Sequence, residues 1–254
     1  MPTLSVILIT RNEEVNLGDC LASLEGIAQQ IVVVDTNSSD RTLEIASNYG
    51  AVLAQPPDWP GFGPQKNRAL DLATGDWVLS LDADERLTPA LRSEILAAIN
   101  HPVKTECFAI PRSSWYCGRF IQHSGWTPDY VDRLFKRGTA RFSDDLVHER
   151  LMPNGQVGKL KNAMLHYSFM NYAQVQEKME RYSTDSAKQA FLKGRKGSPL
   201  KAITHGAWAF FRTYILRLGF LDGSQGLSLA YANAQGSYYR YIKLWHLNKK
   251  AKSG

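Results

Sequence analysis

The chain has 254 residues, 44% of them hydrophobic, and a formal net charge of +6. A chain of this length can bury a substantial core, in one elaborated domain or in two. No apolar run approaches the roughly 18 residues of a membrane-spanning helix, and the N-terminus lacks the basic region and the cleavage site of a signal peptide. Three cysteines without metal-like spacing cannot all pair, which favours a reduced, cytosolic compartment (Cys20, Cys107 and Cys117).

The first 100 residues alternate between strand and helix patterns. LSVILIT, at residues 4–10, is a continuous run rich in β-branched residues, as in a buried strand of a parallel sheet. Polar residues at 36–40 supply turn and N-cap chemistry for the helix that follows. The alternation favours a parallel sheet with helices on both faces. The expected strands are 4–10, 31–34, 51–54 and 77–81, and the expected helices are 17–24, 41–49, 65–73 and 89–100.

The stretch GDWVLSLDADER, at residues 75–86, is the most informative part of the chain. Its apolar strand ends in Asp82-Ala83-Asp84, and two carboxylates two residues apart at a strand's end usually face the same way. Ligands of open α/β sheets bind at the carboxyl ends of the strands. A pair of carboxylates there is suited to a divalent cation that holds a diphosphate, although the same pair also occurs by chance in turns.

Four segments follow one another between residues 4 and 150: SVILITRNEE, IVVVDTNSSDRT, GPQKNRALDLATGDWVLSLDADE and DDLVHERL. In this ordered set the chain resembles the family 2 glycosyltransferases of the GT-A fold. The later run FFRTYILRLGFLDGSQGLSLAYANA extends the resemblance to the lipopolysaccharide core-biosynthesis β-1,4-glucosyltransferases, over nearly the whole chain. The resemblance implies an α/β GT-A domain in residues 1–170, with a Rossmann-like, mostly parallel sheet flanked by helices. A helical, basic and aromatic extension would occupy residues 171–254.

The resemblance also implies a reaction and its donor site. A hexose, glucose from UDP-glucose, would pass with inversion to a sugar hydroxyl of the lipid-linked inner core of lipopolysaccharide. The charge that develops on the departing diphosphate needs a metal, Mn²⁺ or Mg²⁺. Asp84 matches the metal ligand and Asp82 a position near ribose and metal, while Lys66 either faces a phosphate or is a solvated helix lysine. The residues matched to the nucleobase site are Asp35 and Arg68, with Thr10, Arg11 and Glu13 in the loop that lines it.

Inversion by single displacement requires one base for the acceptor hydroxyl. Many relatives carry Glu-Asp at this point, whereas this chain has Asp144-Asp145-Leu146-Val147-His148-Glu149, which resembles the core glucosyltransferase subgroup. We expect Glu149 to be the base and His148 to orient or bind substrate, with Asp145 as the rival base. Partial burial would give such a carboxylate the raised pKa that it needs.

His166, in Leu165-His166-Tyr167, follows the base segment at a distance similar to that in GT-A enzymes. These enzymes often add a histidine from this region to the metal, and an imidazole ligand would favour Mn²⁺ over Mg²⁺. The alternative is a structural histidine in an apolar strand.

Charge is unevenly distributed along the chain. Residues 1–150 hold 14 Lys and Arg against 20 Asp and Glu, whereas residues 151–254 hold 16 against 4. No nucleic-acid motif accompanies the basic part, so an anionic membrane surface is the favoured partner. The enzyme would then be cytoplasmic and peripheral on the inner face of the bacterial inner membrane. Two aromatic stripes accompany the basic residues and would face the membrane or pack on the catalytic domain: Trp208, Phe211, Ile215 and Leu218, and then Tyr231, Tyr238, Tyr241 and Trp245.

Three other functions are weighed against this one. A sugar nucleotidyltransferase also uses paired carboxylates on a parallel sheet, but it would normally have a Gly-rich basic loop where this chain has residues 11–14. A catalytically inactive binding module would not need both the Asp-x-Asp pair and a base. A polyprenyl-phosphate glycosyltransferase has less need of a base, because its acceptor already carries a nucleophilic charge.

Overall fold

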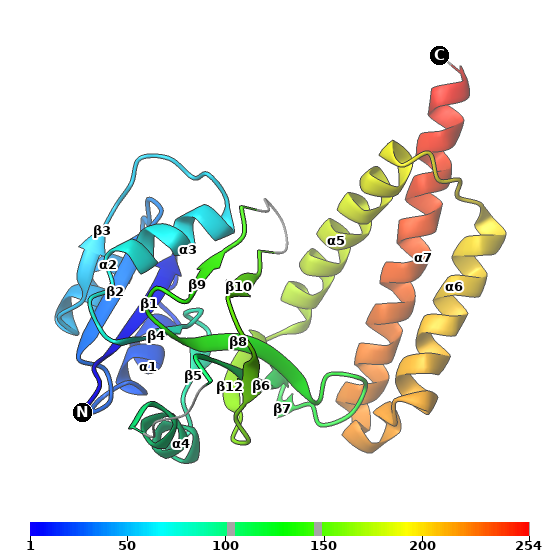
Figure 1. Cartoon of the computed structure of the whole chain (residues 1–254). Helices are drawn as coiled ribbons and strands as arrows, with labels where there is room; N and C mark the ends of the chain where they lie inside the picture. The colour runs from blue at the N-terminus through cyan, green and yellow to red at the C-terminus, as the bar shows by residue number, and fades with distance from the viewer. Residues whose placement is uncertain (101–104, 145–148, 254) are drawn as a thin grey trace. The chain divides into compact units, whose positions relative to one another are not determined.

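The computed structural model describes residues 1–100, 105–144 and 149–253 (Figure 1). The chain divides into two units, Met1–Arg112 with Asp129–His166, and Ser113–Pro128 with Tyr167–Gly254. The sequence analysis placed one boundary at residue 170. It did not predict the excursion of the chain at Ser113–Pro128 into the second unit. That excursion belongs to the second unit because Tyr116 and Ile121 are part of its hydrophobic core.

Four parallel strands form one half of the main sheet, in the order β3-β2-β1-β4. The central strand β1 pairs with β2 on one side and with β4 on the other, and Thr10 lies opposite Asp35 in the register. The strands therefore end at a common edge, as the sequence predicts for the GT-A fold. Their bounds are β1 (Leu4–Thr10), β2 (Gln30–Asp35), β3 (Val52–Ala54) and β4 (Trp77–Ser80).

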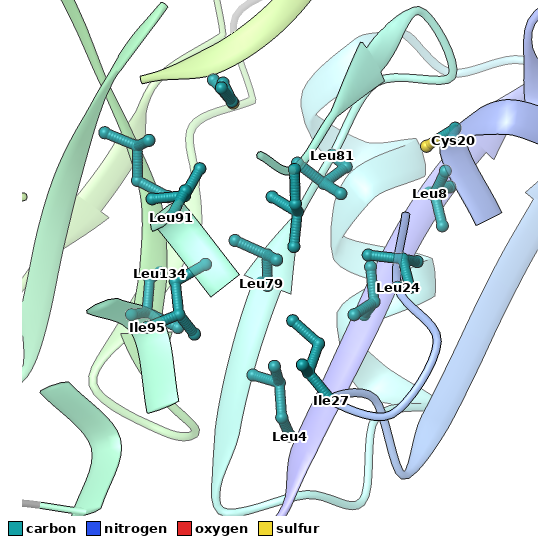
Figure 2. Close-up of a cluster of buried hydrophobic side chains, with 14 of the residues drawn as sticks. Leu4, Leu8, Cys20, Leu24, Ile27, Leu79, Leu81, Leu91, Ile95 and Leu134 are labelled. Atoms are coloured by element: carbon teal, nitrogen blue, oxygen red, sulfur yellow. The ribbon is translucent and has the colours of Figure 1, made fainter. Parts of the chain in front are cut away.

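Helices cover both faces of these four parallel strands. Successive side chains of a strand point to opposite faces, so β1 contributes to a hydrophobic core on each side. Leu4 and Leu8 of β1 belong to one core with α1 and α4 (Figure 2), whereas Ile7 belongs to a second core with α3. The four predicted helices are confirmed in position and order. They are α1 (Leu17–Ala22), α2 (Thr42–Asn48), α3 (Phe62–Asp71) and α4 (Pro89–Asn100).

Antiparallel strands, which the sequence analysis did not predict, complete the sheet. Strand β8 (Asp129–Lys136) pairs with β4 and with β6 (Cys107–Tyr116). The two-residue strand β5 (Glu85–Arg86), directly after the Asp-x-Asp segment, pairs with β12 (Met164–Phe169). The remaining strands are β7 (Arg119–Phe120), β11 (Val157–Lys159) and the separate hairpin of β9 (Ala140–Phe142) and β10 (Leu151–Pro153).

The second unit is largely helical, with α7 packed against both α5 and α6. The Asn171 and Ser198 side chains cap α5 and α6 by accepting hydrogen bonds from backbone N–H groups. Within the described ranges, no helix combines the length and apolar character needed to cross a membrane. The elements are α5 (Tyr172–Leu192), α6 (Pro199–Phe211), the π-helix η1 (Arg212–Leu216), the 3₁₀-helix η2 (Gly219–Asp222) and α7 (Gly223–Ser253).

Candidate active site

The ends of β1 and β2 are joined through the buried carboxylate of Asp35. Its Oδ2 accepts a hydrogen bond from Thr10 Oγ1 at 2.8 Å, and its Oδ1 accepts one from the Ser38 backbone N–H at 2.9 Å. Ser38 Oγ also donates to Oδ2. The Asp35 side chain has no exposed surface, and its contact with a nucleobase stays a prediction. Through these hydrogen bonds Asp35 holds the two loops that follow β1 and β2.

The loop after β1 lies close to the Asp-x-Asp pair. Arg11 is exposed, while Glu13 is partly buried and accepts a hydrogen bond from Asn16 Nδ2 at 3.1 Å. Burial raises the pKa of Glu13, the Asn16 hydrogen bond lowers it in part, and the negative charges of Asp84 and Asp82 raise it further. These carboxylates therefore share one electrostatic environment at the sheet edge.

Both oxygens of Asp82 are occupied by cationic side chains. Lys66 Nζ of α3 lies 3.1 Å from Oδ1, and Arg133 Nη2 of β8 donates to Oδ2. Burial raises the pKa of Asp82, but the positive charges of Arg133 and Lys66 outweigh this and hold it well below its usual range. Asp82 was predicted from the sequence as a second metal ligand, and that role stays a prediction.

Arg133 and Glu85 are buried charges that the sequence analysis did not identify. Arg133 Nη2 also donates to Glu85 Oε1 at 2.7 Å, and Glu85 Oε2 accepts from the Asp82 backbone N–H at 2.9 Å. Burial raises the pKa of Glu85. The available signal was weak, because Arg133 directly precedes the apolar pair Leu134-Phe135 in a strand that has three other charged residues.

Asp84 and His166 come together through the pairing of β5 with β12. This register places His166 opposite Glu85, the residue next to Asp84, and His166 Nε2 lies 3.4 Å from Asp84 Oδ2. Both side chains are partly exposed, so they remain accessible to a ligand. The two residues that the sequence assigned to a metal therefore converge from separate strands.

The donor set at this point suits a divalent cation with few protein ligands. In the part of the chain that the structure describes, no three His, Cys, Asp or Glu side chains are arranged as a metal cluster. Mg²⁺ and similar ions are commonly held by one or two carboxylates together with substrate phosphates and waters. Asp84 and His166 fit such a site.

Glu149 lies against α3, where Lys66 Nζ is 3.0 Å from its Oε1. Its backbone position is fixed by hydrogen bonds between Ser143 and Arg150, which neighbour the β9–β10 hairpin. Gly63 of α3 is required at this contact, since a Cβ there would lie 1.8 Å from Ser143 O. The other two residues predicted in this segment, His148 and Asp145, lie outside the described residues.

Lys66 thus joins the two carboxylates Asp82 and Glu149, whereas Arg68 is directed elsewhere. The Arg68 guanidinium donates to both carboxylate oxygens of Asp58, at 2.9 and 3.0 Å, and to Gln65 Oε1 at 3.0 Å. The sequence grouped Arg68 with Asp35 at the nucleobase. In the structure, Arg68 ties α3 to the loop that carries Asp58.

The comparisons with known proteins identify the family. Residues 5–156 match Glycosyl transferase family 2, so the chain belongs to this family. It is 31% identical to the lipopolysaccharide core biosynthesis glycosyltransferase LpsC of Rhizobium meliloti, over 94% of this chain and 93% of that protein. It is 28% identical to an uncharacterized glycosyltransferase of Rickettsia typhi, over 100% of this chain and 90% of the relative.

Among solved structures, S. aureus TarS 1–349 is similar with a TM-score of 0.52 at 17% identity, covering 97% of this chain and 92% of that one. This likeness shows the fold. The predicted GT-A fold and the predicted enzyme class, a glycosyltransferase, are therefore confirmed, and the nucleotidyltransferase alternative is set aside.

Proposed function

We propose that the protein transfers glucose from UDP-glucose to a sugar hydroxyl of the lipopolysaccharide inner core, with inversion at the anomeric carbon. The observation that carries this proposal is the convergence of Asp84, His166, Asp82, Lys66 and Glu149 around the carboxyl edge of the parallel strands. The similarity to LpsC, a protein named for lipopolysaccharide core biosynthesis, supports the acceptor class.

Asp84 and His166 would hold the divalent cation, and the imidazole favours Mn²⁺ over Mg²⁺. When bound, the cation supplies Lewis-acid stabilisation for the diphosphate that leaves. Asp82 remains paired with Lys66 and Arg133 and acts as a positioning residue for the segment that carries Asp84.

Glu149 would accept the proton of the acceptor hydroxyl. As the hydroxyl oxygen bonds to the anomeric carbon, the bond from that carbon to the diphosphate oxygen breaks on the opposite face. Lys66 holds the Glu149 carboxylate beside Asp82, so the orientation of the base depends on α3. His148, next to Glu149, would bind or orient the substrate.

The nucleobase would lie against the loop after β1, where Thr10, Arg11 and Glu13 are found. Thr10 and Ser38 are held by the buried Asp35, which fixes the ends of β1 and β2 relative to each other. The structure thus supports a positioning role for Asp35, while Arg68 shapes the neighbouring loop through Asp58.

The helical unit would place the enzyme on the inner face of the bacterial inner membrane. Each residue of the first aromatic stripe has 42–53% of its surface exposed. The stripe consists of Trp208, Phe211, Ile215 and Leu218. The second stripe is divided, since Tyr231 is exposed while Tyr241 stacks on His205 at 4.2 Å. The first stripe, with Arg212 and Arg217 beside it, is the surface suited to a lipid interface.

The test is a transfer assay with radiolabelled donors and two acceptors. UDP-glucose should label lipopolysaccharide truncated to its inner core, and NMR of the product should show the inverted anomer. UDP-galactose and GDP-mannose should label it far less. Label that appears in undecaprenyl phosphate but not in the truncated lipopolysaccharide would move the enzyme to the polyprenyl-phosphate class.

A further inference from the structure

The second unit contains a cavity of about 300 Å³ that has no role in the proposed transfer reaction. All of its lining residues belong to this unit, mainly to α5 and α7 and to the excursion at Ser113–Pro128. Its wall combines aromatic rings with two cationic side chains, Lys178 and Arg240. The rings are those of Tyr116, Trp126, Phe169 and Tyr182.

The two cations of this cavity lack carboxylate partners among the described residues. Lys178 Nζ donates to Ser168 O at 3.2 Å and lies 4.5 Å from the centroid of the Phe169 ring. Arg240 Nε is buried without a hydrogen-bond partner within the described ranges, and the guanidinium lies 5.6 Å from the centroid of the Tyr241 ring. A buried polar group that makes no hydrogen bond is costly, so an anion at this position would stabilise it.

Acidic side chains in this part of the chain are engaged or exposed elsewhere. Glu180 pairs with Lys243 at 2.7 Å, and the buried Asp222 accepts hydrogen bonds from Ser124 Oγ and from backbone N–H groups. Among the described residues, no Asp or Glu lines the cavity. The positive charge of Lys178 and Arg240 is therefore not neutralised locally.

Further cationic side chains lie near Arg240, outside the cavity. This residue also lines two neighbouring hollows, of about 110 and 220 Å³. The first holds Lys193 and Arg195, and the second holds Arg195, Lys196 and Lys201. In the part of the chain that the structure describes, no acidic residue lines either hollow. Arg240 thus shares these hollows with cations from the segment between α5 and α6 and from the first turn of α6.

We propose that this cavity binds a phosphate ester, with Arg240 and Lys178 on the phosphate and the aromatic rings against the group that carries it. A guanidinium presents paired N–H groups that match phosphate oxygens, and the flat faces of aromatic rings pack against apolar surfaces while Tyr and Trp keep a polar edge. The ester belongs to an anionic lipid headgroup or to a phosphorylated saccharide. This second site goes beyond the proposed transfer reaction and is independent of it.

Calorimetry with the full chain tests the site by binding alone. The probes are dihexanoyl phosphatidic acid, below its micelle concentration, and glucose 6-phosphate, with dihexanoylglycerol and glucose as their neutral counterparts. We expect one phosphate probe to bind and the neutral counterparts not to bind. Arg240→Gln and Lys178→Gln should each raise its Kd about tenfold or more, as expected for a lost charge-assisted hydrogen bond, and Arg240→Lys should recover part of the affinity.

The controls remove the same charge from the same helices outside this cavity. Lys250→Gln in α7 and Lys188→Gln in α5 change exposed side chains and should leave the Kd within about twofold. Binding of the lipid probe or of the sugar phosphate identifies the source of the ester. Phosphate probes that bind no better than their neutral counterparts, or equal losses in the control variants, overturn the proposal. Because calorimetry needs no turnover, an enzyme without transfer activity is a separate result.

Discussion

The two units differ in whether their buried or partly buried cationic side chains have acidic partners. At the sheet edge of the first unit, Lys66 and Arg133 are buried, and each bridges two carboxylates within about 3 Å. In the helical unit, Arg240 and Lys178 have no acidic partner among the described residues, and large apolar side chains of α6 and η1 are exposed. A buried cluster of paired charges fixes the positions of its side chains. Cations without acidic partners among the described residues are instead suited to a partner that supplies anions.

The largest effect should follow a change at Asp84. Asp84→Asn removes the carboxylate that lies 3.4 Å from His166, and metal stabilisation of a leaving group amounts to several kcal/mol. We expect turnover with UDP-glucose to fall by about 10³-fold or more while the fold persists, measured as radiolabel transfer in limiting Mn²⁺. Asp71→Asn, on an exposed surface pair with Arg141, is the control. Normal turnover of Asp84→Asn would remove the metal assignment.

Glu149→Gln should lower turnover by about 10²–10⁴-fold, the usual contribution of a general base. Binding of UDP-glucose should hardly change, because the proposed base would act on the acceptor and not on the donor. Calorimetry for the donor and steady-state kinetics for the acceptor separate the two effects. Asp145→Asn is the matched variant, and a larger loss there with a nearly normal Glu149→Gln would transfer the role to Asp145.

Arg133→Met tests whether the first unit depends on its paired charges. It leaves Asp82 and the buried Glu85 without their shared cation, and breaking a buried ion pair costs about 3–5 kcal/mol. Urea denaturation should show this loss, whereas Arg141→Met, at an exposed pair, should cost about 1 kcal/mol or less. Equal losses in the two variants would contradict a special role for the buried cluster.

The same variant has a pH signature. The pKa of Asp82 is lowered in the folded protein, so its contribution to stability is present above its unfolded pKa of about 3.9. That contribution is lost as pH falls through the folded pKa. The difference in unfolding free energy between the wild type and Arg133→Met should therefore shrink as the pH is lowered below about 4.

Local patterns and non-local pairing explain what the sequence could and could not predict. The strands β1, β2 and β4 are continuous apolar runs, and Asp84, Lys66 and Glu149 lie in recognisable segments. Arg133 reaches Asp82 only because β8 pairs antiparallel with β4, and His166 meets Asp84 only because β12 pairs with β5. These two pairs are 51 and 82 positions apart in the sequence. The resemblance to GT-A enzymes predicted His166 at the metal, whereas composition and spacing did not indicate the partners of Arg133.

Asp35 shows that the sequence could locate a side chain without revealing its hydrogen-bond partners. The sequence placed its carboxylate at the end of β2, but it could not reveal that Thr10 and Ser38 occupy both oxygens. Burial of a polar side chain depends on its neighbours in space. Under the proposed function, the loops that Asp35 supports would contact the nucleobase.

Asp35→Ala should consequently act on donor binding through loop geometry. It leaves the Thr10 and Ser38 hydroxyl groups without their acceptor, and leaving a buried group unsatisfied costs about 1–3 kcal/mol. We expect the Kd for UDP to rise about tenfold by calorimetry, with UDP still preferred over CMP. Asp35→Asn, which keeps one acceptor oxygen, should lose less. An unchanged Kd in Asp35→Ala would show that the loops hold without it.

The smallest effects belong to the exposed surface of the helical unit, where many weak contacts add up. Each Lys or Arg near an anionic membrane contributes about 1 kcal/mol, and this attraction decays over a Debye length of about 10 Å at 0.1 M salt. Binding to vesicles with phosphatidylglycerol should therefore exceed binding to neutral vesicles and fall as salt rises.

The apolar stripe and the basic residues can be separated by substitution. Trp208→Ser with Phe211→Ser removes two exposed rings and should weaken binding at every salt concentration, because apolar burial is not screened by salt. Charge reversal at Lys249 and Lys250 should weaken it mainly at low salt, and reversal at Lys243 should also break its pair with Glu180. Val52→Ser, an exposed apolar position of the first unit, is the control. Co-sedimentation that is equal for neutral and anionic vesicles would reject electrostatic attraction, and loss of binding in Val52→Ser would place the membrane contact outside the helical unit.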